Sequence, residues 1–153
     1  MLQRIQTVFL GLTVICMVAG IFFPIWVSVE DTGLYKLFPL QYSVTGETGT
    51  QVVYYPYCIT AILMAAAATI AIMEIRRYDD RILQIKLGTL NSLILMGVMI
   101  CAVLFSNQLQ TEHPGSDYGS GLYLDFAAVT FNWLAVRFIR RDEKLVRDSD
   151  KIR

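Results

Sequence analysis

Three polar side chains lie inside stretches that are otherwise apolar, and their types could support chemistry. Asp125 and Asn132 are seven residues apart, on the same face of a helix, and Asn91 lies in a separate apolar stretch. Polar groups are costly in hydrocarbon, so such residues are functional candidates, here for a proton, ion or substrate path. The alternative has Asp125 near an interface, bonded to water or loop amides, and both asparagines joining helices by hydrogen bonds. We favour the alternative, because a transport path normally needs more polar residues at several depths.

A second candidate set is the basic stripe that follows the last apolar stretch. Its members recur at spacings of three and four residues, as on one side of a helix. Such a stripe suits anionic lipid headgroups, and it could equally contact a protein partner. Interspersed acids keep its net charge too low for a dedicated nucleic-acid arm, so no nucleic-acid partner is expected. The candidate contacts are Arg137, Arg140, Arg141, Lys144 and Arg147.

Catalytic and metal-binding patterns are missing from the sequence. It contains no nucleophile elbow, zinc-protease, phosphate-loop or dinucleotide-binding motif. The single histidine, His113, has only Glu112 and Asp117 nearby, which is weak evidence for a metal site. The three cysteines fall in different apolar stretches and are expected to be small core residues. We therefore expect no catalytic residues, no metal, no cofactor and no enzyme activity.

The elements that hold these residues are predicted from apolar runs. Hydrophobic residues make up 55% of the 153 and charged residues 17%, with a mean hydropathy of +0.50. A membrane-crossing helix needs roughly 20 apolar residues. Four runs satisfy this length, and the first is too long for a signal-peptide core. We predict one integral membrane domain over residues 1–153, an all-α four-helix bundle with spans at about 7–27, 57–75, 82–105 and 121–139.

The distribution of charge predicts the orientation of the spans. Twelve of the thirteen basic residues fall on the side that carries both termini, and Lys36 is the exception. Because positive charge is retained in the cytoplasm, both termini are predicted to be cytoplasmic. Glu74 and Lys86 lie at the cytoplasmic ends of their spans and are interpreted as interfacial anchors. The tail, residues 140–153, is expected to continue the last helix.

Two loops are predicted on the outer side. Residues 28–56 contain β-branched and aromatic runs at 42–45 and 50–55 on either side of a Gly-containing turn, which predicts a hairpin. Residues 34–38 are a candidate third strand; the alternative is an irregular lid. Residues 106–120 are polar and rich in Gly and Ser, and are expected to form a mobile loop.

Three segments carry a family resemblance: MLQRIQT at 1–7, RILQIKLGTLN at 81–91 and RFIRRDEKLVRDSDKIR at 137–153. In these the chain is similar to an uncharacterised family from Bacteroidota, domain of unknown function 4293. The resemblance implies a bacterial inner membrane with the outer loops in the periplasm, and it implies no activity. The layout also resembles that of claudin-like proteins by analogy only, because residues 28–56 lack both the Trp and the paired Cys of those proteins.

These observations lead to two function hypotheses. The first is a non-enzymatic accessory or scaffold subunit that binds other membrane proteins, or itself, within the bilayer. It rests on small residues at four-residue spacings, such as Ala61 and Ala65 or Ala67 and Ala71, which allow helices to approach closely. The second is a small transporter or channel that uses the polar residues of the last helix.

Overall fold

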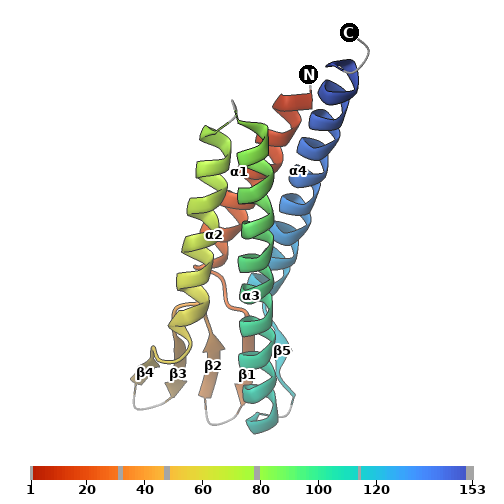
Figure 1. The fold of residues 1–153 in the computed structure, drawn as a ribbon. Coiled ribbons are helices and arrows are strands. Elements are labelled where there is room, and N and C mark those ends of the chain that lie inside the picture. Colours follow the sequence, from red (N-terminus) through yellow and green to blue (C-terminus); the bar gives the residue numbers. More distant parts are fainter. Residues whose placement is uncertain (1, 31–32, 47–48, 78–79, 114, 151–153) are drawn as a thin grey trace.

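The computed structural model describes residues 2–30, 33–46, 49–77, 80–113 and 115–150, with side chains from Ile5 to Val146 within those ranges. It has four helices and a five-stranded antiparallel sheet (Figure 1). The elements are α1 (Leu2–Gly20), β1 (Trp26–Glu30), β2 (Gly33–Leu37), β3 (Tyr42–Gly46), β4 (Gly49–Val53), α2 (Cys58–Arg76), α3 (Arg81–Glu112), β5 (Asp117–Tyr118) and α4 (Ser120–Asp150).

The four helices pack side by side, each against two neighbours, in the cyclic order α1, α2, α3, α4. Among the described residues, three helices are long and apolar enough to cross a membrane: Cys58–Arg76, Arg81–Glu112 and Ser120–Val146. Large apolar side chains remain exposed on each of these helices, among them Ile62, Leu93 and Phe126. Water-exposed apolar surface of this extent is unfavourable, so the chain is compatible with a multi-pass membrane protein.

The sheet lies at the opposite end of the helices from the two termini (Figure 1). Its strand order is β4-β3-β2-β1-β5. The predicted hairpin is confirmed, because β3 and β4 pair from Tyr42 opposite Val53 to Gly46 opposite Gly49. The candidate third strand is also confirmed as β2, which pairs with β3. Strands β1 and β5 were not predicted.

The predicted end of the first helix is wrong, because α1 stops at Gly20 and residues 26–27 belong to β1. Pro24 cannot donate a backbone hydrogen bond and disfavours helical geometry in the residue before it. Trp26 then enters the sheet, where its side chain is 0% exposed and its Nε1 donates to Ser116 Oγ at 3.0 Å.

The predicted mobile loop at residues 106–120 is also wrong in its first half, because α3 continues to Glu112. At 32 residues the helix is about 48 Å long, more than the hydrocarbon thickness requires. Its final turns pack on the sheet, where Leu109 joins Trp26 and Leu37 in a buried cluster. At the other end of the chain, the expected continuation of the last helix is confirmed as far as Asp150.

Small residues bring α2 close to its neighbours. Ala61, Ala67, Ala68 and Ala71 are all buried between the helices, whereas Ala65 is exposed. Short side chains on one face let adjacent backbones approach. Most of the small-residue pattern on α2 is therefore used inside the protein, and this face also positions the polar residues described next.

Candidate functional site between the helices

The structure brings two of the three predicted polar residues together. Asn91 on α3 and Asn132 on α4 are 0% and 1% exposed. Asn91 Nδ2 donates to Asn132 Oδ1 at 3.0 Å, and Asn132 Nδ2 donates to Ser92 Oγ at 2.8 Å and to the Gly88 carbonyl oxygen at 3.3 Å. We call Gly88, Asn91, Ser92 and Asn132 the amide cluster. These bonds join α3 to α4, as the interhelical interpretation of the asparagines predicts.

Glu74 lies beside the amide cluster, and the sequence interpretation of this residue as an interfacial anchor is wrong. Its side chain is 0% exposed, and neither carboxylate oxygen has a hydrogen-bond partner among the described residues. A Cβ built on Gly88 would lie 2.7 Å from Glu74 Oε1, so the carboxyl group occupies the space that Gly88 leaves open. Gln84, also buried, donates from Nε2 to the Glu74 carbonyl oxygen at 2.9 Å.

The position of Glu74 follows a pattern that the sequence contains. Buried positions on α2 include Met64, Ala67, Ala71 and Glu74, at spacings of three and four residues. That spacing defines one face of a helix. Extending the small-residue face of α2 to its last turn would have identified Glu74 as an interior residue. Its position at the end of the apolar run led instead to its interpretation as an interfacial anchor.

Asp125, the third predicted residue, lies apart from the amide cluster. It is 1% exposed, and both of its carboxylate oxygens lack a hydrogen-bond partner among the described residues. Its Oδ1 is 3.5 Å from a Cβ built on Gly20, at the end of α1. Asp125 therefore faces the interior between α1 and α4, next to the end of α1.

An apolar layer separates Asp125 from the amide cluster. Seven residues of α4 correspond to about 10 Å along the helix axis. Ala128 lies in this interval and belongs to a buried cluster contributed by all four helices. The other buried members of that cluster are Cys16, Met17, Met64, Ala67, Ala68, Leu95 and Val98. In this conformation the interior has a carboxyl group on either side of a packed apolar layer.

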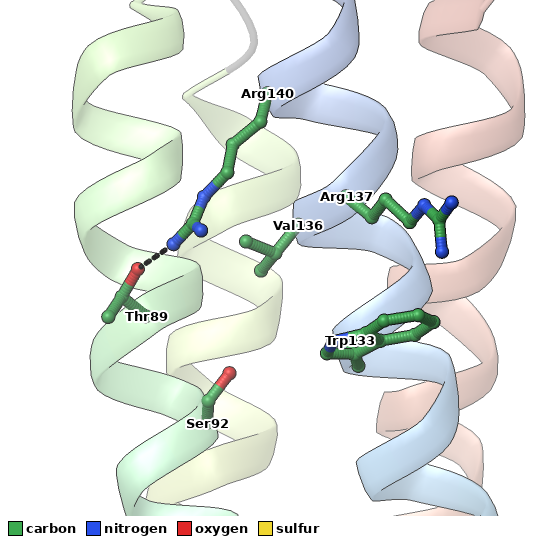
Figure 2. A pocket seen from close by; sticks show the side chains of 6 residues that line it. All are labelled: Thr89, Ser92, Trp133, Val136, Arg137 and Arg140. Carbon is green, nitrogen blue, oxygen red and sulfur yellow. Dashed lines mark hydrogen bonds between the residues drawn. The ribbon is translucent and has the colours of Figure 1, made fainter.

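A groove opens on the outer surface beside the amide cluster, between α3 and α4 (Figure 2). Its volume is about 430 Å³. Arg140 reaches from α4 toward α3, where its Nη2 donates to Thr89 Oγ1 at 3.2 Å. The guanidinium carbon of Arg137 lies 5.2 Å from the ring centroid of Trp133. The lining residues are Thr89, Ser92, Trp133, Val136, Arg137 and Arg140.

The remaining members of the predicted basic stripe do not line this groove. Arg141 and Lys144 are exposed on α4. The side chain of Arg147 lies outside the described residues. Among these side chains, Arg140 bonds a polar group of another helix, whereas Arg137 lies over Trp133 of its own helix (Figure 2).

His113 lies among side chains of the sheet instead of in a mobile loop. Its Nδ1 is 2.7 Å from Glu30 Oε1, and its Nε2 is 3.4 Å from the Tyr42 hydroxyl. The described residues contain no group of three or more His, Cys, Asp or Glu side chains placed to hold a metal ion. The cysteines Cys16, Cys58 and Cys101 are free thiols.

Comparison with curated proteins gives no match to this chain. Comparison with protein families gives a match over residues 2–152 to the family described as "Domain of unknown function (DUF4293)". That match covers all four helices and the sheet. The chain therefore belongs to the DUF4293 family.

Proposed function

We propose that this chain is a non-enzymatic, proton-translocating protein of the bacterial inner membrane. Its four helices form a membrane-spanning bundle, with both termini in the cytoplasm and the sheet on the outer side. The observation that supports the proposal is the burial of Glu74 and Asp125 between the helices, with no hydrogen-bond partner for either carboxyl group among the described residues. Ionisable groups inside membrane bundles characteristically mark proton and ion pathways.

The depth of the polar groups also favours transport over the accessory-subunit hypothesis. The sequence suggested too few polar residues for a path, but the interior contains buried polar side chains along most of the helical length. Gln6 is near the start of α1, Glu74 is near the end of α2 and Gln84 is near the start of α3. The amide cluster follows further along α3, and Asp125 is in the first turns of α4, just after β5. In addition, most of the small residues on α2 are used inside the protein, which leaves less of that face for a lateral partner.

Proton movement would require the apolar layer to open. Asp125 and Glu74 would each exchange a proton with water on their own side, because Asp125 is in the first turns of α4, just after β5, and Glu74 is in the last turns of α2. The layer formed by Met17, Met64 and Leu95 would part during transfer between them. A packed apolar layer prevents uncontrolled leakage, so the structure represents a closed conformation in this proposal.

The test is proton flux into liposomes that contain the purified chain and an internal pH-sensitive dye, driven by a potassium diffusion potential. With the potential negative inside, we expect the lumen to acidify faster than in protein-free liposomes. Glu74→Gln and Asp125→Asn should each reduce the protein-dependent rate by about tenfold or more, because an amide cannot carry the proton.

The matched controls are Glu112→Gln and Asp117→Asn, which make the same chemical changes at exposed residues near the sheet. Both controls should keep the wild-type rate. A wild-type rate equal to that of protein-free liposomes would overturn the proposal. So would unchanged flux in Glu74→Gln and Asp125→Asn, provided that both variants elute from gel filtration as the wild type does.

An accessory subunit is the second candidate, and the open edge of the sheet favours it. Strand β4 is the edge of the sheet, and all five of its residues are exposed. Exposed strand edges are templates for pairing with another chain. Purification in mild detergent followed by mass spectrometry should then recover a partner that is lost in Val52→Lys. Reproducible recovery of the chain alone contradicts this candidate.

A further inference from the structure

The groove between α3 and α4 combines cationic, hydroxyl and aromatic groups on one outward-facing surface. Trp133, Val136, Arg137 and Arg140 recur on α4 at spacings of three and four residues, so they share one side of that helix. Thr89 and Ser92 contribute the opposite wall from α3. The six lining residues include no carboxylate. The groove therefore favours an anion with an apolar portion.

Hydrogen bonds within α3 and between α3 and α4 hold the groove in shape. Thr89 Oγ1 donates to the Ile85 carbonyl oxygen at 2.8 Å, so it accepts from Arg140 and fixes the guanidinium across the groove. Ser92 Oγ donates to the Gly88 carbonyl oxygen at 2.9 Å and accepts from Asn132. Ser92, on the α3 wall of the groove, thus belongs to the amide cluster, and its buried hydrogen bonds fix the position of that wall.

The two arginines are suited to a phosphate group. A guanidinium carries several N–H donors in a planar fork that matches phosphate oxygens, and it stacks on aromatic rings. Arg140 uses one nitrogen for Thr89, and Arg137 lies over Trp133. The indole and Val136 provide apolar surface next to these charges. Charged groups beside apolar surface are the pattern expected for a lipid, with its headgroup at the arginines and its acyl chain at Trp133 and Val136.

The depth of the groove agrees with a lipid ligand. Thr89 is eight residues after Arg81, the first residue of α3, which corresponds to about 12 Å along the helix. Tryptophan side chains gather at the boundary between headgroups and hydrocarbon. If the helices span a bilayer, the groove opens sideways toward lipid on the side that carries most of the basic residues, with Arg140 nearer that end than Trp133 (Figure 2).

We propose that this groove binds the phosphate headgroup of one anionic phospholipid, held by Arg140 and Arg137 with its acyl chain against Trp133 and Val136. Basic pockets between membrane helices bind such headgroups in this way. The inference depends on membrane placement of the helices and not on proton movement, so it can fail or succeed separately from the proposed function.

The test measures lipid binding to the purified chain in mild detergent, by native mass spectrometry and by thermal stability. Phosphatidylglycerol should bind with a saturating stoichiometry of one per chain and raise the unfolding temperature, as a ligand of the folded state does. Phosphatidylcholine and inorganic phosphate should do neither. An equal effect of phosphatidylcholine, or an effect of inorganic phosphate alone, overturns the proposal.

Variants of the groove locate the site. Arg137→Gln and Arg140→Gln should each weaken phosphatidylglycerol binding about fivefold, the contribution of one basic side chain near an anionic lipid. The matched control Arg141→Gln removes an exposed arginine that does not line the groove, and should leave binding within about twofold. Equal weakening by Arg141→Gln would indicate general attraction to the basic end and would contradict a site in the groove.

Discussion

Gly88 is the residue on which the interior contacts converge. Its carbonyl oxygen accepts hydrogen bonds from Asn132 Nδ2 and Ser92 Oγ, and the space above its Cα is taken by Val136 and Glu74. The absence of a side chain therefore allows α2 and α4 to approach α3 at the same level. A glycine in a helix is otherwise unfavourable, so its contribution here comes from close packing.

Gly88→Ala should lower the stability of the chain. The new Cβ would lie 2.5 Å from Val136 Cγ2 and 2.7 Å from Glu74 Oε1, and overpacking of this kind costs about 1–3 kcal/mol. Unfolding of the purified chain in detergent, followed by circular dichroism, measures the change. Gly97→Ala is the control on the same helix, because its Cβ would meet only Leu63 Cδ1, at 3.7 Å. Equal losses in both variants would show that the contacts at Gly88 have no special role.

At this scale the sequence predicted which residues are unusual but not how they pair. Asn91, Asn132 and Asp125 stand out because each is polar within an apolar run. The bond between Asn91 and Asn132 depends on the rotation and depth of two helices, which one sequence does not specify. The spacing of Glu74 from Ala71 and Ala67, at three and seven residues, does predict from the sequence that Glu74 faces the interior.

At the scale of elements, the contact between α3 and the sheet brings several titratable groups together. His113, directly after α3, lies 2.7 Å from Glu30 Oε1 and 3.4 Å from the Tyr42 hydroxyl, and its ring centroid is 4.2 Å from that of Tyr35. The pKa of Tyr42 is raised to about 12, chiefly by burial and in addition by the surrounding phenols and carboxylates. The neighbours responsible are Tyr57, Tyr35, Glu112 and Glu30.

This shift in the pKa of Tyr42 predicts a loss of stability at high pH. The unfolded chain loses the phenol proton near the ordinary pKa of 10, whereas the folded chain keeps it to about pH 12. The free energy of unfolding should therefore be unaffected by Tyr42 below pH 10 and should fall as the pH rises from 10 to 12. Unfolding in detergent at a series of pH values measures this fall.

Tyr42→Phe should show a smaller fall over the same pH range, because the ionising group is gone. The control is Tyr55→Phe, which removes a phenol that is 78% exposed and should retain the wild-type fall. If Tyr42→Phe and the wild type lose stability in parallel, the phenol of Tyr42 is not held in its neutral form by the fold.

Sequence patterns over a few residues predicted those elements whose stabilising contacts are close together in the chain. The hairpin of β3 and β4 is signalled by β-branched residues around a tight turn, and both strands formed as expected. Strand β1 was hidden because Trp26 and Val27 continue the apolar run of α1. Strand β5 has two residues and forms by pairing with β1, where Asp117 lies opposite Val27, 90 residues earlier in the chain.

For the whole molecule, the arrangement of charge is the feature that the rest depends on. The termini and the α2–α3 connection lie at one end, and the sheet lies at the other (Figure 1). Arg76, Arg77 and Arg81 flank that connection, whereas Lys36 is in β2. The sequence predicted this separation because the positions of charges and the lengths of apolar runs can be counted along the chain, without knowledge of how the helices pack. The orientation in a membrane remains a prediction from the positive-inside rule.

Topology mapping by enzyme fusion tests the central claim, that the helices cross a membrane with both termini in the cytoplasm, most directly. Alkaline phosphatase, which is active only outside the cytoplasm, would be fused after Gly46 in the β3–β4 turn and, in a second fusion, after Arg153. We predict activity for the fusion at Gly46 and none for the fusion at Arg153, with comparable expression of both. Activity at Arg153, or inactivity at Gly46, would contradict the account.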